Sequence, residues 1–283
     1  MKKSAAGTLH DRRRERNAIL IMILVSIPIL FIYLAFFRNA FLDSATGELT
    51  LGNFRFLTGE IRLSQYTVPP MGPAFRNSVV FTVVVTLCEV IISCMAGYAL
   101  ARLDFRGKKV IPFSLLALRL FPGMLLLIGV LYVLMTLKLV NSLQGVILAA
   151  IALRLPGSTF IIRNFFSAVP ADIENSALVD GCNRLTAFFQ VVIHMVKPGI
   201  ASISLFSFMS AWSNYLLFNT LIFNSKTPVL ATYIRVLSRN DQMIADYGVF
   251  AAMALIYMLP VLIFFFISQK QLMQGNIGGG KGI

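Results

Sequence analysis

The sequence predicts an all-α polytopic membrane protein with six transmembrane helices. Of its 283 residues, 57% are hydrophobic and only 13% are charged, whereas soluble domains carry roughly 25% charged residues. The apolar residues gather in six long runs. A helix needs about 20 such residues to cross roughly 30 Å of hydrocarbon with every backbone group bonded internally. Lys and Arg, by contrast, concentrate in alternate connections between the runs.

The six runs set the predicted transmembrane domain, residues 18–268. They are Ala18 to Phe37, Ser78 to Ala101, Val110 to Leu134, Leu143 to Phe165, Gly199 to Phe223, and Tyr247 to Ser268. The first follows a basic stretch, as a signal peptide would. It is longer than a signal peptide's apolar region and lacks a clear small-residue cleavage site, so we expect it to be retained.

The basic residues predict the orientation. Fifteen of the 25 Lys and Arg residues lie on the side that holds both chain ends, eight lie on the other side, and Arg119 and Arg154 fall inside the runs. Because positive charge is retained in the cytoplasm, both termini should be cytoplasmic. The tails are then a basic one (1–17) and a Gly-rich one (269–283). The loop at 38–75, predicted irregular or briefly helical, is external, and the loop at 167–197 is cytoplasmic.

Several function classes are disfavoured by the same features. The net charge of +13 does not predict a nucleic-acid partner, because the basic residues lie between apolar runs and form no continuous patch. No polar stretch is long enough to bury a soluble catalytic core. His10 and His194 are isolated, and no Ser-His-acid set or metal-ligand spacing is visible. We therefore expect neither catalytic residues nor a metal site in this chain.

The loop at 167–197 carries the signals of two short helices joined by a tight turn. Pro170 suits a first helical turn, Asp172 and Glu174 favour the positive end of a helix dipole, Gly181 can end a helix in the left-handed conformation, and Asn183 can cap the next one. Such a hairpin could dock into a groove on a cytosolic partner. Ile173, Ala177 and Leu178 are its predicted contacts. The alternative is an amphipathic connector lying on the membrane surface.

The spacing in this loop resembles that of the binding-protein-dependent ABC importer permeases, whose loop reads Glu-Ala-Ala, three residues, Gly, nine residues, Ile-x-Leu-Pro. Here the corresponding residues are Asn175-Ser176-Ala177, Gly181 and Val191-Val192-Ile193-His194, without a gap. Asn175 stands where the motif has Glu, and His194 stands where it has Pro. Neighbouring Glu174 offers a substitute carboxylate, and Pro198 offers a substitute bend before the fifth helix.

The resemblance covers nearly the whole chain and sharpens toward the sugar permeases of the maltose-transporter type. The segments that carry it are Asn77-Ser78, Ala96 to Arg102, Phe105 to Gly107, Phe121-Pro122, Arg163 to Phe166, and Ala211 to Leu216.

The resemblance implies a type I ABC importer (MetI-like) permease fold in the cell membrane, which imports a carbohydrate by alternating access. Implied partners are a second homologous permease, two copies of a cytosolic ATPase and an extracytoplasmic solute-binding protein. ATP and Mg²⁺ would be used by the ATPase, and this chain would bind no cofactor. The implied coupling residues are Glu174, Asn175, Ser176, Ala177, Leu178, Asp180, Gly181 and Cys182.

Five residues are candidates for the translocation path. Arg119 and Arg154 lie within apolar runs, where ionisable groups usually face a cavity or a partner. They pair with Glu89 or bond carbonyls opened by Pro122 and Pro156, or else they line the path of an acidic or heavily hydroxylated sugar. Another group, Trp212, Asn214 and Tyr215, could stack on and hydrogen-bond a sugar. Helix packing is the alternative for these three.

Three other functions are weighed against this one. The same machinery could import a non-sugar solute such as glycerol phosphate. An ion-coupled secondary transporter would be expected to show intramembrane carboxylates, and only Glu89 qualifies. A polytopic membrane enzyme would be expected to cluster polar residues at one membrane face, and no such cluster is visible in the sequence.

Overall fold

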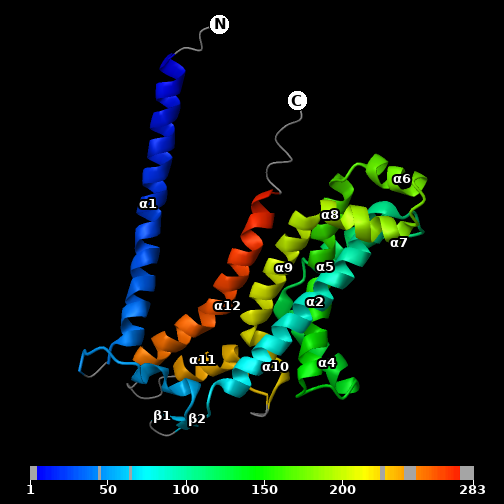
Figure 1. The fold of residues 1–283 in the computed structure, drawn as a ribbon. Helices are drawn as coiled ribbons and strands as arrows, with labels where there is room; N and C mark the ends of the chain where they lie inside the picture. Colours follow the sequence, from blue (N-terminus) through cyan, green and yellow to red (C-terminus); the bar gives the residue numbers. More distant parts are fainter. Residues whose placement is uncertain (1–4, 44–45, 64–65, 224–226, 239–246, 275–283) are drawn as a thin grey trace. The chain divides into compact units, whose positions relative to one another are not determined.

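The computed structural model describes residues 5–43, 46–63, 66–223, 227–238 and 247–274, and most of them are helical (Figure 1). Four helices are long and apolar enough to span a membrane, or up to six if each of two bent helix pairs is one span. The chain divides into two units, residues 1–70 with 237–257 and residues 71–236 with 258–283. The all-α membrane architecture is confirmed.

Four of the predicted spans lie within single long helices: α1 (Ala5–Phe41), α2 (Gly72–Arg102), α5 (Leu143–Ala168) and α12 (Tyr247–Gln274). Helix α1 also includes most of the predicted basic tail. Residues 275–283, which belong to the predicted Gly-rich tail, lie outside the described residues.

The prediction of one continuous third helix is wrong. The run from Val110 to Leu134 forms α3 (Val110–Leu118) and α4 (Gly123–Thr136), which meet at 102°. Pro122 is the N-cap of α4, with φ −58° and ψ 125°. Proline cannot continue an α-helix and biases the preceding residue toward extended backbone. Phe121-Pro122 therefore breaks the run in its middle.

The predicted fifth helix is also interrupted. It consists of α9 (Lys197–Trp212) and α10 (Tyr215–Leu221), and Asn214 caps the second by accepting a 3.1 Å hydrogen bond from the Leu217 amide. Before α9 the chain bends by 78°, with Pro198 in the first turn. This is the bend that the sequence placed at Pro198.

The first unit holds α1, a short helix η1 (Gly52–Leu57), the strands β1 (Ile61–Leu63) and β2 (Tyr66–Val68), and the first part of α12. The strands pair antiparallel, so the loop at 38–75 is more ordered than predicted. The buried Asn53 amide donates to the carbonyls of Ala40 and Leu42, at 3.1 and 2.8 Å. It thereby satisfies carbonyls that the end of α1 leaves unpaired.

The second unit is built on α2, which packs along α5 and α9. Two glycines permit close approach of these helices. A Cβ on Gly97 would lie 2.6 Å from Ile162 Cγ2 of α5, and one on Gly199 would lie 2.5 Å from the Phe165 ring. Helix α11 (Leu230–Ser238) begins beside α2, where the Leu230 amide donates a 2.8 Å hydrogen bond to Ser78 Oγ.

Past α5 the chain forms the predicted pair of short helices, α6 (Ala171–Val179) and α7 (Arg184–Ala187). Five residues of π-helix, η2 (Phe188–Val192), and the short α8 (Ile193–Met195) lead from α7 to α9. Buried Phe188 and Val192 of η2 belong to the same apolar cluster as Ile162 and Phe166 of α5. The helical hairpin is therefore anchored to the bundle from both ends.

Candidate coupling loop and intramembrane polar site

The turn between α6 and α7 is fixed by backbone hydrogen bonds. Gly181 has φ +94°, the left-handed region that favours glycine, and an added Cβ there would meet no neighbouring atom. Its amide donates to the Leu178 carbonyl at 3.2 Å, and the Cys182 amide donates to the Ala177 carbonyl at 3.0 Å. These two bonds form a Schellman motif, which satisfies the last carbonyls of α6. Gly181 thus ends α6 in the left-handed conformation, as the sequence predicts, and its part in coupling stays a prediction.

Asn183 begins α7 as the sequence predicts. Its side-chain oxygen accepts a 2.8 Å hydrogen bond from the Thr186 amide and a 2.9 Å bond from the Thr186 hydroxyl. A cap of this kind contributes about 1 kcal/mol to helix stability. Residues 180–183 therefore connect α6 to α7 through backbone conformation and capping.

Glu174 faces inward, toward α2. Its carboxylate accepts a 2.6 Å hydrogen bond from Tyr98 Oη and lies 3.1 Å from Arg102 Nε. Arg102 also donates a 2.6 Å hydrogen bond to the Val169 carbonyl, just before α6. The Glu174 side chain is only 6% exposed. Glu174 cannot be the outward substitute for the motif's glutamate, because its charge already holds α6 against the end of α2.

The outward face of the hairpin differs from the predicted one. Ala177 is buried and Leu178 is half-buried, because this side of α6 packs on the chain itself. The exposed apolar side chains are Val179, Leu185 and, more weakly, Ile173. The remaining predicted coupling residues divide similarly: Asn175, Ser176, Asp180 and Gly181 are exposed, and Cys182 is half-buried.

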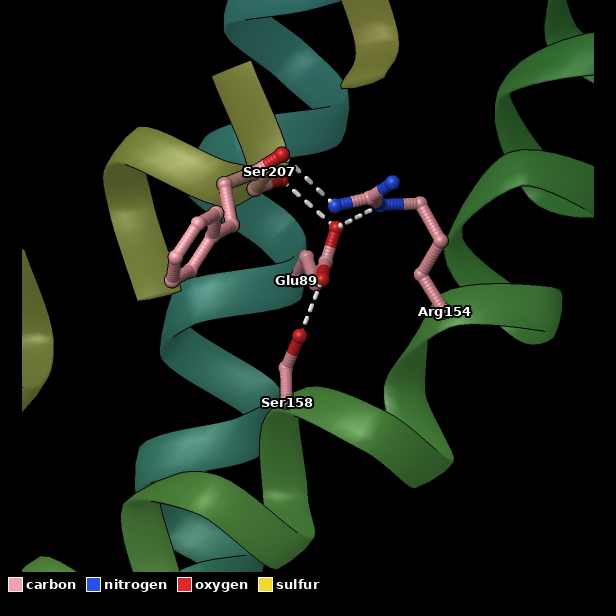
Figure 2. A network of polar contacts seen from close by, with 5 residues as sticks. Glu89, Arg154, Ser158 and Ser207 are labelled. Carbon is pink, nitrogen blue, oxygen red and sulfur yellow. Dashed lines mark hydrogen bonds and ion pairs between the residues drawn. The ribbon is translucent and has the colours of Figure 1, made fainter. Parts of the chain in front are cut away.

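A second polar site lies between the packed helices α2, α5 and α9. Figure 2 shows Glu89 of α2 contacted by Arg154 and Ser158 of α5 and by Ser207 of α9. Arg154 Nε donates to Glu89 Oε2 at 2.8 Å, Ser207 Oγ donates to the same oxygen at 2.6 Å, and Ser158 Oγ donates to Oε1. Glu89 is fully buried. A buried carboxylate needs such partners, because its desolvation is otherwise costly.

Arg154 and Arg119 line one cavity of about 670 Å³. Its walls come from the α3–α4 break, from the middle of α5, and from Phe206 of α9. Arg154 meets Glu89 on one side and donates a 3.0 Å hydrogen bond to the Phe206 carbonyl. The sequence offered pairing with Glu89 as one role for the two arginines, and Arg154 forms this pair. Arg119 lies instead against Gly157, where an added Cβ would be 2.8 Å from Nη2.

The other three candidate path residues lie apart from this cavity. Trp212 is buried beside Phe75 and Phe208 and lines a separate apolar pocket of about 270 Å³. Asn214 caps α10. Tyr215 donates to Asn219 at 2.7 Å, and the Arg235 guanidinium lies 4.7 Å from the centre of its ring. The structure gives all three packing or capping contacts, and their role in a path stays a prediction.

Comparison with known proteins decides the family. Residues 89–274, which include the hairpin and the Glu89 site, match the family described as binding-protein-dependent transport system inner membrane component. The chain belongs to this family. It is therefore a multi-pass permease of the ABC importer type in the inner membrane.

Two curated relatives illustrate the similarity of this permease to others. It is 29% identical to the diacetylchitobiose uptake permease of Streptomyces coelicolor, over 99% of this chain and 92% of the relative. It is 31% identical to the sulfoquinovosyl glycerol permease of Agrobacterium fabrum, over 77% of this chain and 76% of the relative.

The fold of the permease is also found in a solved structure. A chain from the crystal structure of a bacterial ABC transporter that imports the acidic polysaccharide alginate aligns with a TM-score of 0.74 and 20% identity. The alignment covers 95% of this chain and 99% of that one.

Sequence reasoning missed the residues that complete both sites of the permease. Ser158 and Ser207 belong to no recognisable motif. The available signal was that each is a small hydroxyl residue within an apolar run. Tyr98 and Arg102 appeared in the sequence only as part of the resemblance. Their spacing of four residues, which puts both on one face of α2, was the available signal.

Proposed function

We propose that this permease translocates a carbohydrate across the cell membrane by alternating access, driven by ATP hydrolysis in a partner subunit. A second homologous permease would complete the path, two copies of a cytosolic ATPase would bind the 167–197 loops, and an extracytoplasmic solute-binding protein would deliver the sugar. The permease itself provides the path for the sugar and hydrolyses no ATP.

The observation that carries the coupling role is the joint between α6 and α2. The loop at 167–197 is a helical hairpin of fixed angle, and Glu174 connects it to a spanning helix through Tyr98 and Arg102. A force applied to α6 would therefore be transmitted to α2 as a rigid-body displacement, the kind of movement that packed helices allow. Val179 and Leu185 supply the exposed apolar surface for the ATPase groove.

The choice of a carbohydrate as the substrate is supported by two relatives, whose names specify diacetylchitobiose and sulfoquinovosyl glycerol as their solutes. A cavity of about 670 Å³ next to α5 offers room for a sugar unit within the span. An ion-coupled mechanism is disfavoured, because Glu89, the intramembrane carboxylate that it would use, is already occupied by Arg154 and two serines.

The energy source distinguishes an ATP-driven importer from an ion-coupled transporter. The complete complex would be reconstituted in proteoliposomes with ATP enclosed, and uptake of radiolabelled oligosaccharides would be measured with the binding protein outside. We expect uptake that requires ATP and survives a protonophore and a sodium ionophore. Uptake that follows an imposed ion gradient without ATP would contradict the proposal. ATP-driven uptake of glycerol phosphate with no sugar uptake would keep the machinery and replace the substrate.

A further inference from the structure

The charges around the 670 Å³ cavity do not balance. Among the described residues that line it, the ionisable ones are Arg119 and Arg154, and none is acidic. Arg154 is neutralised by Glu89, whose carboxylate lies 2.8 Å away behind the cavity wall. Arg119 has no carboxylate within salt-bridge distance among the described residues. Since arginine stays protonated in proteins, the cavity carries one uncompensated positive charge.

The position of Arg119 is built into the fold. It follows α3 directly, at the break where the chain turns 102° into α4. Its guanidinium lies over Gly157 of α5, where the backbone offers no side chain, so that Nη2, Cζ and Nε all come within 3.2 Å of the place that a Cβ would take. Gly157 thus provides the space that holds this side chain flat against the cavity wall.

The adjoining wall favours an anion as well. Helix α4 begins at Gly123, which lines the same cavity, and no side chain caps this end. The amino end of a helix carries a partial positive charge. Arg119 is exposed to the space beside the α3–α4 break, and an unpaired guanidinium within an apolar run is costly unless an anion or water-filled space compensates it. A planar oxoanion would meet that need, because the arginine fork binds carboxylates and related groups through two parallel hydrogen bonds.

We infer that the transported carbohydrate is anionic, and that Arg119 binds its oxoanion group, a carboxylate, sulfonate or phosphate, during passage. The inference rests on the proposed function and adds the substrate class to it. In this arrangement Arg154 is a positioning residue, which keeps Glu89 neutralised so that no negative charge faces the anion. Ser158 and Ser207, which donate hydrogen bonds to the Glu89 carboxylate, serve the same purpose.

The test compares anionic and neutral sugars in the complete reconstituted complex. The anionic probes are alginate and polygalacturonate oligosaccharides, and the neutral probes are maltose, cellobiose and diacetylchitobiose. Uptake is measured for the wild type, Arg119→Gln and Arg119→Lys. Arg106→Gln is the matched control, because it removes one arginine from an exposed turn that does not line the cavity. ATPase stimulation by the loaded binding protein reports whether coupling is intact.

We expect the wild type to import an anionic probe. Arg119→Gln should lower this uptake on the order of ten-fold or more, because the charge-assisted hydrogen bonds to the oxoanion are lost. Arg119→Lys keeps the charge but not the two parallel hydrogen bonds, so it should lose less than Arg119→Gln, and Arg106→Gln should change nothing. ATP-driven import of neutral sugars alone would overturn the inference and leave the proposed function standing. Equal losses for neutral and anionic probes in Arg119→Gln would also overturn it, since they would indicate a structural or lipid-binding role. Absence of any carbohydrate uptake would refute both.

Discussion

The phenol of Tyr98, in the last turns of α2, donates a 2.6 Å hydrogen bond to the carboxylate of Glu174, in the middle of α6. These residues lie 76 positions apart in the sequence. The bond joins the helix that packs along both α5 and α9 to the short helix proposed to bind the ATPase. A partner that moves α6 would therefore act on the centre of the bundle.

Replacing Glu174 by alanine should destabilise this joint strongly. Arg102, only 13% exposed, would lose its ionic partner, and loss of one member of a buried pair costs about 3 kcal/mol or more. Tyr98→Phe should cost about 1 kcal/mol, since it removes one hydrogen bond and leaves the ion pair. Thermal unfolding of the complex in detergent measures both. Asp172→Ala, exposed on the same helix, is the control, and an equal effect there would contradict the account.

Cysteine cross-linking tests which face of α6 meets the ATPase. In a background with Cys88, Cys94 and Cys182 replaced by serine, a cysteine at Val179 should cross-link to the ATPase, because this side chain is 87% exposed. A cysteine at Ala177, which is 9% exposed, should not. The reverse pattern would restore the contact surface predicted from the sequence and would require α6 to rotate on binding.

The pair of Glu89 and Arg154 is open to a double-mutant cycle. Arg154→Leu leaves the fully buried Glu89 without its ionic partner and should destabilise the permease by about 3 to 5 kcal/mol. Glu89→Leu leaves Arg154, whose side chain is 21% exposed beside the cavity, and should cost less. The double variant should cost clearly less than the sum, because neither charge remains. Thermal melting of the three purified variants supplies the data. Additive losses would show that the 2.8 Å contact contributes no coupling.

The contact of α2 with α5 at Gly97 predicts a size limit. Gly97→Ala should destabilise the permease by about 1 to 3 kcal/mol, because the new Cβ would lie 2.6 Å from Ile162 Cγ2 and 3.1 Å from the Arg163 amide nitrogen. In an Ile162→Ala background, Gly97→Ala should cost less than in the wild type, since the nearer atom is absent and the two changes are then non-additive. Gly129→Ala is the control, because its Cβ would meet nothing within 4 Å. Full stability of Gly97→Ala would refute the packing.

The sequence predicted the features that depend on local composition. The four spans that are single helices follow from apolar length, and the turn follows from Gly181, which takes the left-handed conformation that few other residues accept. Asn183 and Pro198 act through their own backbone and side-chain chemistry. Each of these effects is contained within a few neighbouring residues, so one sequence was sufficient to find them.

What the sequence could not predict depends on contacts between distant segments. Glu174 looked like an outward-facing charge, because the partner that buries it, Tyr98, is far away in the chain. The break at Pro122 was hidden by apolar residues on both sides, which satisfy a hydropathy count whether or not the helix is continuous. Arg154 forms an ion pair with Glu89 and Arg119 does not, and this difference depends on the packing of α5 on α2.

The claim that the loop at 167–197 couples this permease to an ATPase is tested most directly by mild-detergent purification from the native membrane. ATPase activity of the eluate would be assayed for the wild type, Gly181→Val and Gly129→Val. We predict that a second permease and an ATPase co-purify with the wild type and with Gly129→Val. Gly181→Val should insert into the membrane but release the ATPase, because a β-branched residue at position 181 would be strained at the φ of +94° that the turn requires. An ATPase that stays bound to Gly181→Val with full activity, or a permease that purifies alone, would contradict the coupling role.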